Sequence, residues 1–483
     1  MNPPFDVIVL GSGPAGRSAG LQAAKAGKRV AIVENHSSFG GGCVLTGTLP
    51  SKSFRESVYR WSLGSRGTLG RELEHSTPVA MGSDRPEMDR LIRRKDRVVL
   101  EESKVVEDQL ARNNIALYRG SARFVGLYEI EVTPVLGSPL GLSERLIGNT
   151  FFIATGSRPI SSSVFQRDGE LVHDSDSILS LEQIPETLVV LGAGIIGCEY
   201  TSMFCMAGSK VYLIDRRHEI LANVDREVVA HLTERFEASG VEVLLKAETI
   251  RIEKDFEKKR CIVHLSSGHR IISNAVFVAM GRHGNTESLG LEGLGLKPSE
   301  RGLLEVNGNF QTEIPHIYAI GDVIGAPALA ATSYEQGRLA CLHALGAADP
   351  GQSGLPAVYP YGIYTIPEIS MIGITEEQAV EQKLDFVVGR GNYRELARGQ
   401  IVGDHWGLLK ILVERKTLKL LGVHIVGDNA ADLIHIGQAV MILGGDVNYF
   451  IHSVFNYPTL AEGYKTAAFN AVNLIKGIQS GPQ

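Results

Sequence analysis

The chain has 483 residues, with 48 Lys and Arg, 54 Asp and Glu and a net charge of −6. At roughly 150 residues per domain this length predicts about three domains, and the mildly acidic balance argues against a nucleic-acid partner, which favours basic surfaces. The five cysteines are scattered and no apolar run is long enough to cross a membrane, so we expect a soluble, cytoplasmic protein without a disulfide framework. The first strand is expected near Phe5, which leaves no room for a targeting peptide.

The N-terminal residues predict a strand, a glycine-rich turn, a helix and a second strand. The apolar, β-branched run 6–10 indicates a buried strand, an alanine-rich helix is expected over 18–26, and a second strand over 29–33 ends at Glu34. The turn between the first strand and the helix is Gly11-Ser12-Gly13-Pro14-Ala15-Gly16.

The same pattern returns 181 positions later in the chain. A strand over 188–191, a helix to about Ala207 and a strand over 210–214 surround a second turn, and Asp215 follows the last strand. This turn is Gly192-Ala193-Gly194-Ile195-Ile196-Gly197. One such turn is a weak signal, but two in matched context strongly indicate a repeated function.

Each turn has the residues that a dinucleotide needs. The first glycine permits the tight turn, the second lets backbone N–H groups approach a pyrophosphate, and the third lets helix and strand pack closely. The acid at the end of the second strand accepts hydrogen bonds from a ribose diol. We therefore expect two bound dinucleotides; the alternative, two unrelated glycine-rich turns, explains the repeat less well.

The two terminal acids differ in their neighbours. Glu34 has no basic residue near it in sequence, which suits a bare ribose as in FAD. Asp215 precedes Arg216 and Arg217, which add cations for a 2′-phosphate, so the second site is expected to accept both NAD(H) and NADP(H). The alternative is that both arginines are solvated or pair with Glu219.

Further segments resemble the pyridine nucleotide-disulfide oxidoreductases, flavoproteins such as glutathione reductase. The run from Gly42 and Cys43 through Thr48 to Pro50-Ser51-Lys52 is similar to their redox-active segment. Further matching segments are Ala154-Thr155-Gly156, Gly281-Arg282 and Tyr318-Ala319-Ile320-Gly321-Asp322. The resemblance implies an α/β fold with two Rossmann-like domains, for FAD and NAD(P), and a C-terminal α+β dimerisation domain.

The resemblance also implies domain boundaries and a homodimer. The FAD domain is expected over 1–155 and 282–350, the NAD(P) domain over 156–281, and the interface domain over 351–483 after a linker at 350–356. In the interface domain we expect antiparallel strands over 408–413 and 420–426 and helices after Asp432 and Ala461. Small-molecule dinucleotides are the expected ligands, with no metal, nucleic acid or membrane partner.

Two departures from the family pattern narrow the function. Thr48 stands where the family has its second redox cysteine, and a hydroxyl cannot form a disulfide. The family's C-terminal His-Pro-x-x-x-Glu is Tyr457 to Glu462 here, and a phenol is a poor base near neutral pH. Asn456-Tyr457-Pro458-Thr459 and residues 362–370 are also similar to the branch of soluble, Si-specific pyridine nucleotide transhydrogenases.

That branch implies hydride exchange between NADPH/NADP⁺ and NAD⁺/NADH through FAD, by a ping-pong mechanism without a redox disulfide. Lys52 is expected beside flavin N5 and paired with Glu199, and the apolar Ile195 is expected under the nicotinamide. A helix that begins near Ala330 is expected to point its N-terminus at the flavin. Tyr457, with Glu462, is expected at the partner subunit's pocket, as a wall or as a hydrogen-bonding group.

The sequence leaves alternatives at two points, the role of Cys43 and the function of the protein. Cys43 is either a packing residue against the flavin, which we prefer, or a reactive thiol. The enzyme is either a transhydrogenase or an NAD(P)H diaphorase or quinone reductase of the same fold. A further hypothesis for the function is a redox-sensing flavoprotein without catalysis. It conflicts with the retained Lys52, Glu199 and Asp322.

Overall fold

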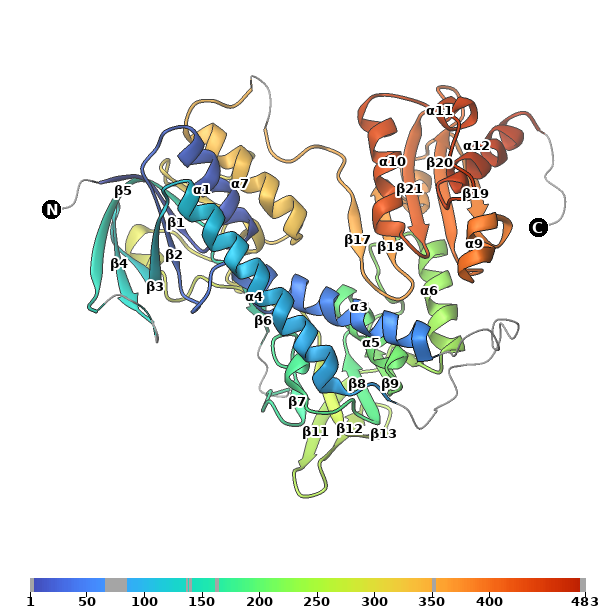
Figure 1. Cartoon of the computed structure of the whole chain (residues 1–483), viewed down its shortest axis with the longest axis horizontal. Coiled ribbons are helices and arrows are strands. Elements are labelled where there is room, and N and C mark those ends of the chain that lie inside the picture. Colours follow the sequence, from blue (N-terminus) through green and yellow to red (C-terminus); the bar gives the residue numbers. More distant parts are fainter. Residues whose placement is uncertain are drawn as a thin grey trace.

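The computed structural model describes residues 4–65, 85–135, 138, 141–160, 165–349 and 353–477, and these residues form three units (Figure 1). The N-terminal unit lies on the left of Figure 1, the middle unit at the bottom and the C-terminal unit on the right. Part of the expected linker, residues 350–352, and the last six residues, 478–483, lie outside the described residues.

The N-terminal unit is built on a six-stranded sheet in the order β1-β2-β3-β4-β5-β16. Strand β1 pairs in parallel with β2 and β5, while β3, β4 and β5 form an antiparallel meander. Apolar side chains from both faces of β1 are buried, as expected for a strand covered on both sides. The strands are β1 (Phe5–Leu10), β2 (Val30–Glu34), β3 (Ala116–Gly126), β4 (Glu129–Pro134), β5 (Glu144–Ile153) and β16 (Ile317–Ala319).

Helices α1 (Pro14–Lys25) and α7 (Ala330–Ala344) pack side by side against this sheet (Figure 1). Their small residues permit a close approach, because a Cβ at Gly337 would lie 2.2 Å from the Ala15 carbonyl oxygen. The other helices of the N-terminal part of the chain are α2 (Gly41–Leu45), α3 (Thr48–Ser65) and α4 (Met88–Arg112). Helix α3 extends from the N-terminal unit towards the other two units.

The middle unit has a five-stranded parallel sheet in the order β10-β9-β8-β14-β7 and an antiparallel sheet β11-β12-β13. A short antiparallel pair, β6 with β15, marks where the chain enters and leaves it. Its elements are β6 (Ser157–Pro159), β7 (Val172–His173), β8 (Thr187–Leu191), α5 (Ile195–Met206), β9 (Lys210–Asp215), α6 (Arg226–Ala238), β10 (Glu242–Leu245), β11 (Thr249–Asp255), β12 (Arg260–Leu265), β13 (Arg270–Ser273), β14 (Ala275–Val278) and β15 (Arg282–Gly284).

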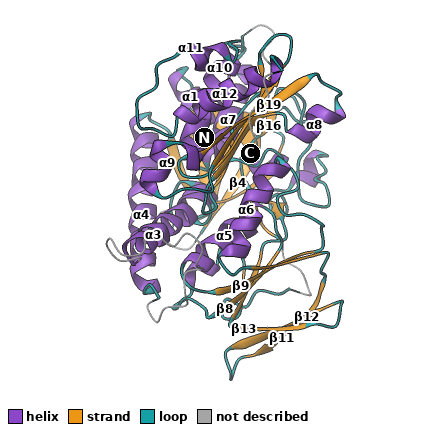
Figure 2. Cartoon of the chain, turned by 90° about the vertical axis from the view of Figure 1, so that its right-hand side faces the viewer, coloured by secondary structure: helices purple, strands orange, loops and turns teal. Residues whose placement is uncertain are grey.

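The C-terminal unit is an antiparallel sheet, β17-β18-β21-β20-β19, covered by helices (Figure 2). A buried ion pair attaches it to the middle unit: Lys410 Nζ lies 2.9 Å from Asp225 Oδ1 at the start of α6. Its elements are β17 (Tyr361–Ile363), β18 (Ile369–Gly373), α8 (Glu376–Glu381), β19 (Phe386–Asn392), α9 (Ala397–Val402), β20 (Leu408–Glu414), β21 (Leu420–Val426), α10 (Ala430–Ile442), α11 (Asn448–His452) and α12 (Glu462–Ile475).

The fold class predicted from the sequence is confirmed, with small differences at element ends. The first helix begins at Pro14, four residues earlier than expected, because proline's fixed φ suits the first helical position. Helix α10 begins at Ala430, before Asp432, which lies in its first turn. The antiparallel pairing of β20 with β21 is confirmed. Among the described residues, no helix is long and apolar enough to cross a membrane.

Candidate active site

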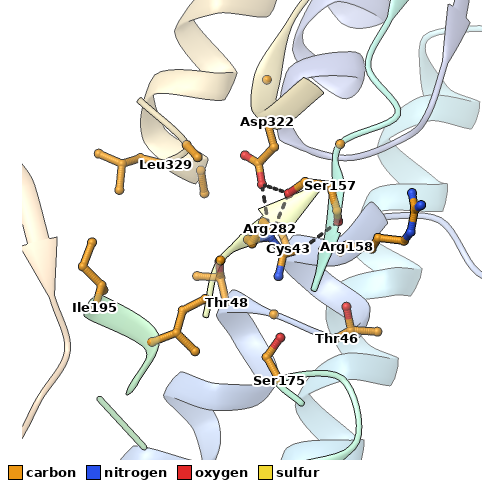
Figure 3. Close-up of a pocket in the computed structure, with 18 of the residues that line it drawn as sticks. Cys43, Thr46, Thr48, Ser157, Arg158, Ser175, Ile195, Arg282, Asp322 and Leu329 are labelled. Atoms are coloured by element: carbon orange, nitrogen blue, oxygen red, sulfur yellow. Dashed lines mark hydrogen bonds and ion pairs between the residues drawn. The ribbon is translucent and has the colours of Figure 1, made fainter. Parts of the chain in front are cut away.

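A cavity of about 1680 Å³ runs between the N-terminal and middle units, and Tyr361, Tyr364 and Met371 of the C-terminal unit also line it. Single-ligand pockets commonly measure roughly 300–1,000 Å³, so this cavity has room for more than one ligand. It is lined by both glycine-rich turns, by both terminal acids and by the segment around Cys43. Figure 3 shows part of this wall, with Cys43, Thr48 and Ile195 among the labelled residues. Of the residues proposed from the sequence to bind cofactors, those on its wall are Gly11, Gly13, Pro14, Ala15, Glu34, Gly42, Cys43, Thr48, Lys52, Thr155, Gly156, Gly192, Gly194, Ile195, Ile196, Glu199, Asp215, Arg216, Arg217, Gly281, Arg282, Gly321, Asp322 and Ala330.

The first glycine-rich turn leaves no room for side chains at its ends. Gly11 has a φ of +107°, and a Cβ there would lie 2.3 Å from the Ala154 carbonyl oxygen. Gly16 lies behind the cavity wall, where a Cβ would lie 2.0 Å from the Gly11 carbonyl oxygen. The turn therefore presents bare backbone at the N-terminus of α1, an arrangement that suits a pyrophosphate.

Glu34 is buried and is held by neutral donors. Its Oε2 accepts hydrogen bonds from the Ser12 backbone N at 2.9 Å and from the Ser12 hydroxyl at 2.6 Å. Its Oε1 accepts a bond from the His36 backbone N at 3.0 Å. The Ser12 hydroxyl also accepts a bond from the Gly40 backbone N at 2.8 Å, so Ser12 joins the turn to the Cys43 segment.

The second turn repeats this geometry. Gly192 has a φ of +106°, and a Cβ there would lie 2.5 Å from the Ala279 carbonyl oxygen. Gly197, like Gly16, lies behind the cavity wall, and its Cβ would lie 1.8 Å from the Gly192 carbonyl oxygen. The N-terminus of α5 therefore offers a second backbone cradle facing the same cavity.

Asp215 differs from Glu34 because a cation holds it. Arg217 donates from Nε to Oδ1 at 3.0 Å and from a terminal nitrogen to Oδ2 at 2.7 Å, while the Ala193 backbone N donates to Oδ2. Although burial alone would raise it, the pKa of the Asp215 carboxyl is lowered by these bonds, and the group stays ionised. Arg216 is exposed on the cavity wall. Glu219 lies close to His218 and Arg226 instead, at 3.5 and 3.7 Å.

The segment around Cys43 holds an isolated thiol. All five cysteines are free, and Cys43 is partly exposed rather than fully buried. Burial is the main effect on its thiol and raises the pKa, and a hydrogen bond with the Thr48 side chain only partly offsets this. A raised pKa reduces the thiolate fraction and hence reactivity, which favours the packing role for Cys43.

Lys52 and Glu199 meet at the junction of the units. Lys52 Nζ on α3 donates to Glu199 Oε2 on α5 at 2.7 Å. The Glu199 side chain is buried, whereas the Lys52 side chain is 27% exposed and lies on the cavity wall. The second carboxylate oxygen, Glu199 Oε1, accepts a bond from the Tyr364 backbone N at 2.8 Å.

Asp322 belongs to a second polar group on the cavity wall (Figure 3). Its Oδ2 accepts a hydrogen bond from the Ser157 hydroxyl at 2.8 Å, and Arg282 Nε donates to that hydroxyl at 2.8 Å. Asp322 lies in the 3₁₀ turn Gly321–Ile324, Ser157 on β6 and Arg282 on β15. The group therefore joins the N-terminal unit to both connections with the middle unit.

Two residues predicted for the site lie away from the cavity of their own chain. Tyr457 is 75% exposed, and Glu462 lies in the first turn of α12, where its Oε2 accepts a bond from the Thr459 backbone N at 3.2 Å. Neither lines the cavity described above. Their expected place at the pocket of a second subunit stays a prediction.

Three contacting residues in this region were not predicted from the sequence. Ser12 lies between two glycines of the first turn, and a hydroxyl at that place was a usable signal. The contacts of Ser157 with Asp322 and of Tyr364 with Glu199 had no local signal, because 165 residues separate each residue from its partner.

The residues present fit two dinucleotides. The two backbone cradles, the two terminal acids and the shared cavity match the requirements of a flavin and a nicotinamide nucleotide. In addition, the Thr155 hydroxyl is buried on the cavity wall and has no hydrogen-bond partner among the described residues. Buried polar groups normally have a partner, so this hydroxyl is available to a ligand.

Comparison with known proteins agrees with this geometry. The pyridine nucleotide-disulphide oxidoreductase family matches residues 5–337, and that family's dimerisation domain matches residues 359–468. A protein of Mycobacterium bovis named soluble pyridine nucleotide transhydrogenase is 42% identical over 478 residues, which cover 98% of each chain. A protein of the same name from Hahella chejuensis is 41% identical over 474 residues, covering 98% of this chain and 99% of the other.

Solved structures show the same fold. The HOCl-induced flavoprotein disulfide reductase RclA from Escherichia coli superposes with a TM-score of 0.83 and 27% identity, over 96% of this chain and 99% of the other. LpdA from Mycobacterium tuberculosis superposes with a TM-score of 0.86 and 24% identity, over 96% of this chain and 98% of the other. The chain therefore belongs to the pyridine nucleotide-disulphide oxidoreductase family and is an oxidoreductase of the flavoprotein type.

Proposed function

We propose that this protein transfers hydride between NADPH/NADP⁺ and NAD⁺/NADH through a bound FAD, in a ping-pong reaction without a redox disulfide. The observation that carries the proposal is the combination of Thr48 near Cys43 with an intact Lys52–Glu199 pair. The hydroxyl removes dithiol chemistry, while the residues expected around the flavin are retained. The names of the relatives, soluble pyridine nucleotide transhydrogenases, support the same reaction.

Bound FAD would supply the hydride acceptor and donor, and the chain's own residues would supply position and charge. The first turn and Glu34 would hold FAD, and the second turn, Asp215 and Arg217 would hold either nicotinamide nucleotide in turn. Lys52 would lie beside flavin N5, and Ile195 would leave the nicotinamide face free of polar groups. The N-terminus of α7 at Ala330 would favour negative charge on the flavin.

The proposed assembly is a homodimer. Tyr457 and Glu462 belong to the part of the chain that matches the family's dimerisation domain. The high exposure of Tyr457 supports a role at a neighbouring subunit, where it would form a wall of the cavity. Its phenol would not act as a base near neutral pH.

The test is an anaerobic titration of the purified protein with NADPH, followed by addition of NAD⁺. We expect loss of the flavin absorbance and then its recovery with stoichiometric formation of NADH. Flavin that stays bleached after NAD⁺ addition would contradict the proposal and favour a quinone or another acceptor. Flavin that neither nucleotide bleaches would favour a non-catalytic protein.

Lys52→Ala tests the role of the cation in the first half of that experiment. The variant is expected to retain FAD but to be bleached by NADPH about 100-fold more slowly, because reacting groups that are misplaced by about 1 Å lose rate on this scale. Rapid-mixing spectroscopy measures the rate. Bleaching as fast as in the unsubstituted protein would exclude Lys52 from the reaction.

A further inference from the structure

Beyond the proposed reaction and resting on it, we infer that Arg55 is a positioning residue that sets the Lys52–Glu199 pair through the tip of the β17–β18 hairpin. The tip comprises residues 364–368, between the ends of β17 and β18. It reaches α3 from the C-terminal unit (Figure 1). Arg55 does not itself line the cavity as far as the described residues define it.

Glu199 is fixed from two sides. One carboxylate oxygen accepts from Lys52 Nζ, and the other accepts from the Tyr364 backbone N–H at 2.8 Å. The Tyr364 ring also lies beneath the cation, with Lys52 Nζ 5.0 Å from the ring centroid. The position of the hairpin tip therefore decides where the Glu199 carboxylate points, and with it the Lys52 ammonium.

Arg55 holds the next residue of the same tip. Its Nε and one terminal nitrogen both donate to the Thr365 carbonyl oxygen, at 3.1 and 3.0 Å. The same terminal nitrogen lies 3.2 Å from Glu368 Oε1, at the far end of the tip. The Arg55 side chain is only 10% exposed, and Thr365 is fully buried.

The geometry makes one continuous connection. Lys52 and Arg55 are three residues apart on α3, so they lie on the same side of that helix. Lys52 reaches Glu199, Arg55 reaches Thr365, and the Tyr364–Thr365 segment joins the two contacts. The hairpin tip is thus clamped to α3 by Arg55 and to α5 by Glu199.

Loss of Arg55 would release one end of the clamp. The buried Thr365 carbonyl would lose both donors, and the partly buried Glu368 carboxylate would lose its cation. The pKa of Glu368 is already raised by burial, which Arg55 opposes, so this carboxyl would become protonated more readily. The hairpin would then shift, and Glu199 would no longer fix Lys52.

The test compares Arg55→Met with Arg60→Ala, a change on the same helix whose side chain is 64% exposed and pairs locally with Glu56. In the FAD-loaded protein, Arg55→Met is expected to lower the limiting rate of flavin reduction by NADPH about 10- to 100-fold, as for misplaced reacting groups. The apparent Kd for NADPH is expected to stay within about threefold, since Arg55 does not contact the cavity. Arg60→Ala is expected to leave both values unchanged.

A double-mutant cycle with Glu199→Ala separates positioning from general destabilisation. If Arg55 acts through Glu199, the double variant reduces no more slowly than Glu199→Ala alone. Multiplicative losses would overturn the inference. The flavin midpoint potential is a readout independent of turnover: Arg55→Met is expected to make it more negative, because the Lys52 charge is no longer held at the flavin, and an unchanged potential would count against the inference.

Arg55→Lys, a more conservative variant, keeps the test possible if Arg55→Met does not fold. Arg55→Lys keeps the charge and one donor, so its reduction rate is expected between those of Arg55→Met and the unsubstituted protein. A folded Arg55→Lys protein with the unsubstituted rate would overturn the inference even if Arg55→Met is insoluble. If the unsubstituted protein is not reduced by NADPH at all, the proposed function fails; normal reduction of every Arg55 variant refutes this inference alone.

Discussion

The two glycine-rich turns have nearly the same backbone but hold their terminal acids in different ways. In both, the last glycine faces the carbonyl oxygen of the first, at 2.0 Å for Gly16 and 1.8 Å for Gly197, measured from an added Cβ. In the first, neutral donors surround Glu34, whereas in the second, Arg217 pairs with Asp215. The backbone geometry of each turn therefore suits a dinucleotide, and the environment of the terminal carboxylate is what distinguishes the two turns.

The largest effects are expected from breaking the shared backbone. Gly16→Ala and Gly197→Ala would each place a Cβ against a backbone oxygen that cannot move without opening the turn. Overpacking of this kind costs about 1–3 kcal/mol or more. We expect Gly16→Ala to be purified without FAD and Gly197→Ala to retain FAD but resist reduction by NADPH, as measured by flavin content and rapid mixing.

Gly293→Ala is the control for both glycine variants, because an added Cβ there meets nothing within 4 Å. It is expected to retain both FAD and reduction by NADPH. If Gly16→Ala and Gly197→Ala lost the same property, the two turns would not serve different ligands.

Glu34→Ala tests the acid of the first turn, which neutral donors surround. The Ser12 backbone and hydroxyl and the His36 backbone N would lose their common acceptor. The two Ser12 donors are buried, and each unsatisfied buried donor costs about 1–3 kcal/mol. FAD is therefore expected to bind at least tenfold more weakly in a titration of the FAD-free protein. The FAD affinity of Glu34→Gln, which keeps one acceptor oxygen, should lie between those of Glu34→Ala and the unsubstituted protein. Unchanged FAD affinity in Glu34→Ala would contradict the role given to Glu34.

Arg217→Ala tests the second turn, where this arginine pairs with Asp215. Charge-assisted hydrogen bonds contribute about 1.5–3 kcal/mol, so kcat/KM for NADPH is expected to fall at least tenfold. The value for NADH is expected to stay or rise, because Asp215 is released for the ribose diol. Arg216→Ala, at the exposed neighbouring cation, is the matched comparison; equal losses for both nucleotides in Arg217→Ala would argue against recognition of the 2′-phosphate.

Cys43→Ser is expected to have the smallest effect. The raised pKa of the thiol leaves little thiolate near neutral pH, and Thr48 offers no disulfide partner. Steady-state transhydrogenase activity should remain within about twofold of the unsubstituted protein. A loss of tenfold or more would mean that the thiol takes part in the reaction.

Much of the fold could be predicted because its signals are local. The apolar runs indicated β1, β8, β20 and β21, and the spacing of glycines indicated both turns, since each depends on a few neighbouring residues. The pairing of Lys52 with Glu199, 147 residues apart, came only from resemblance to a family. Boundaries were less accurate, as at Pro14 and Ala430, because helix ends depend on single capping residues.

The sequence by itself determined that two matched glycine-rich turns exist, that a disulfide between positions 43 and 48 is chemically impossible, and which acid ends each motif. These are properties of backbone freedom and side-chain chemistry that neighbouring residues specify. Only the tertiary structure showed that Arg217 donates hydrogen bonds to Asp215 and that the Ser157 hydroxyl donates one to Asp322. It also showed that Arg55 and Glu199 both form hydrogen bonds with the tip of the β17–β18 hairpin. Such contacts depend on side-chain conformation or on distant segments brought together by packing, and neither is written in local sequence patterns.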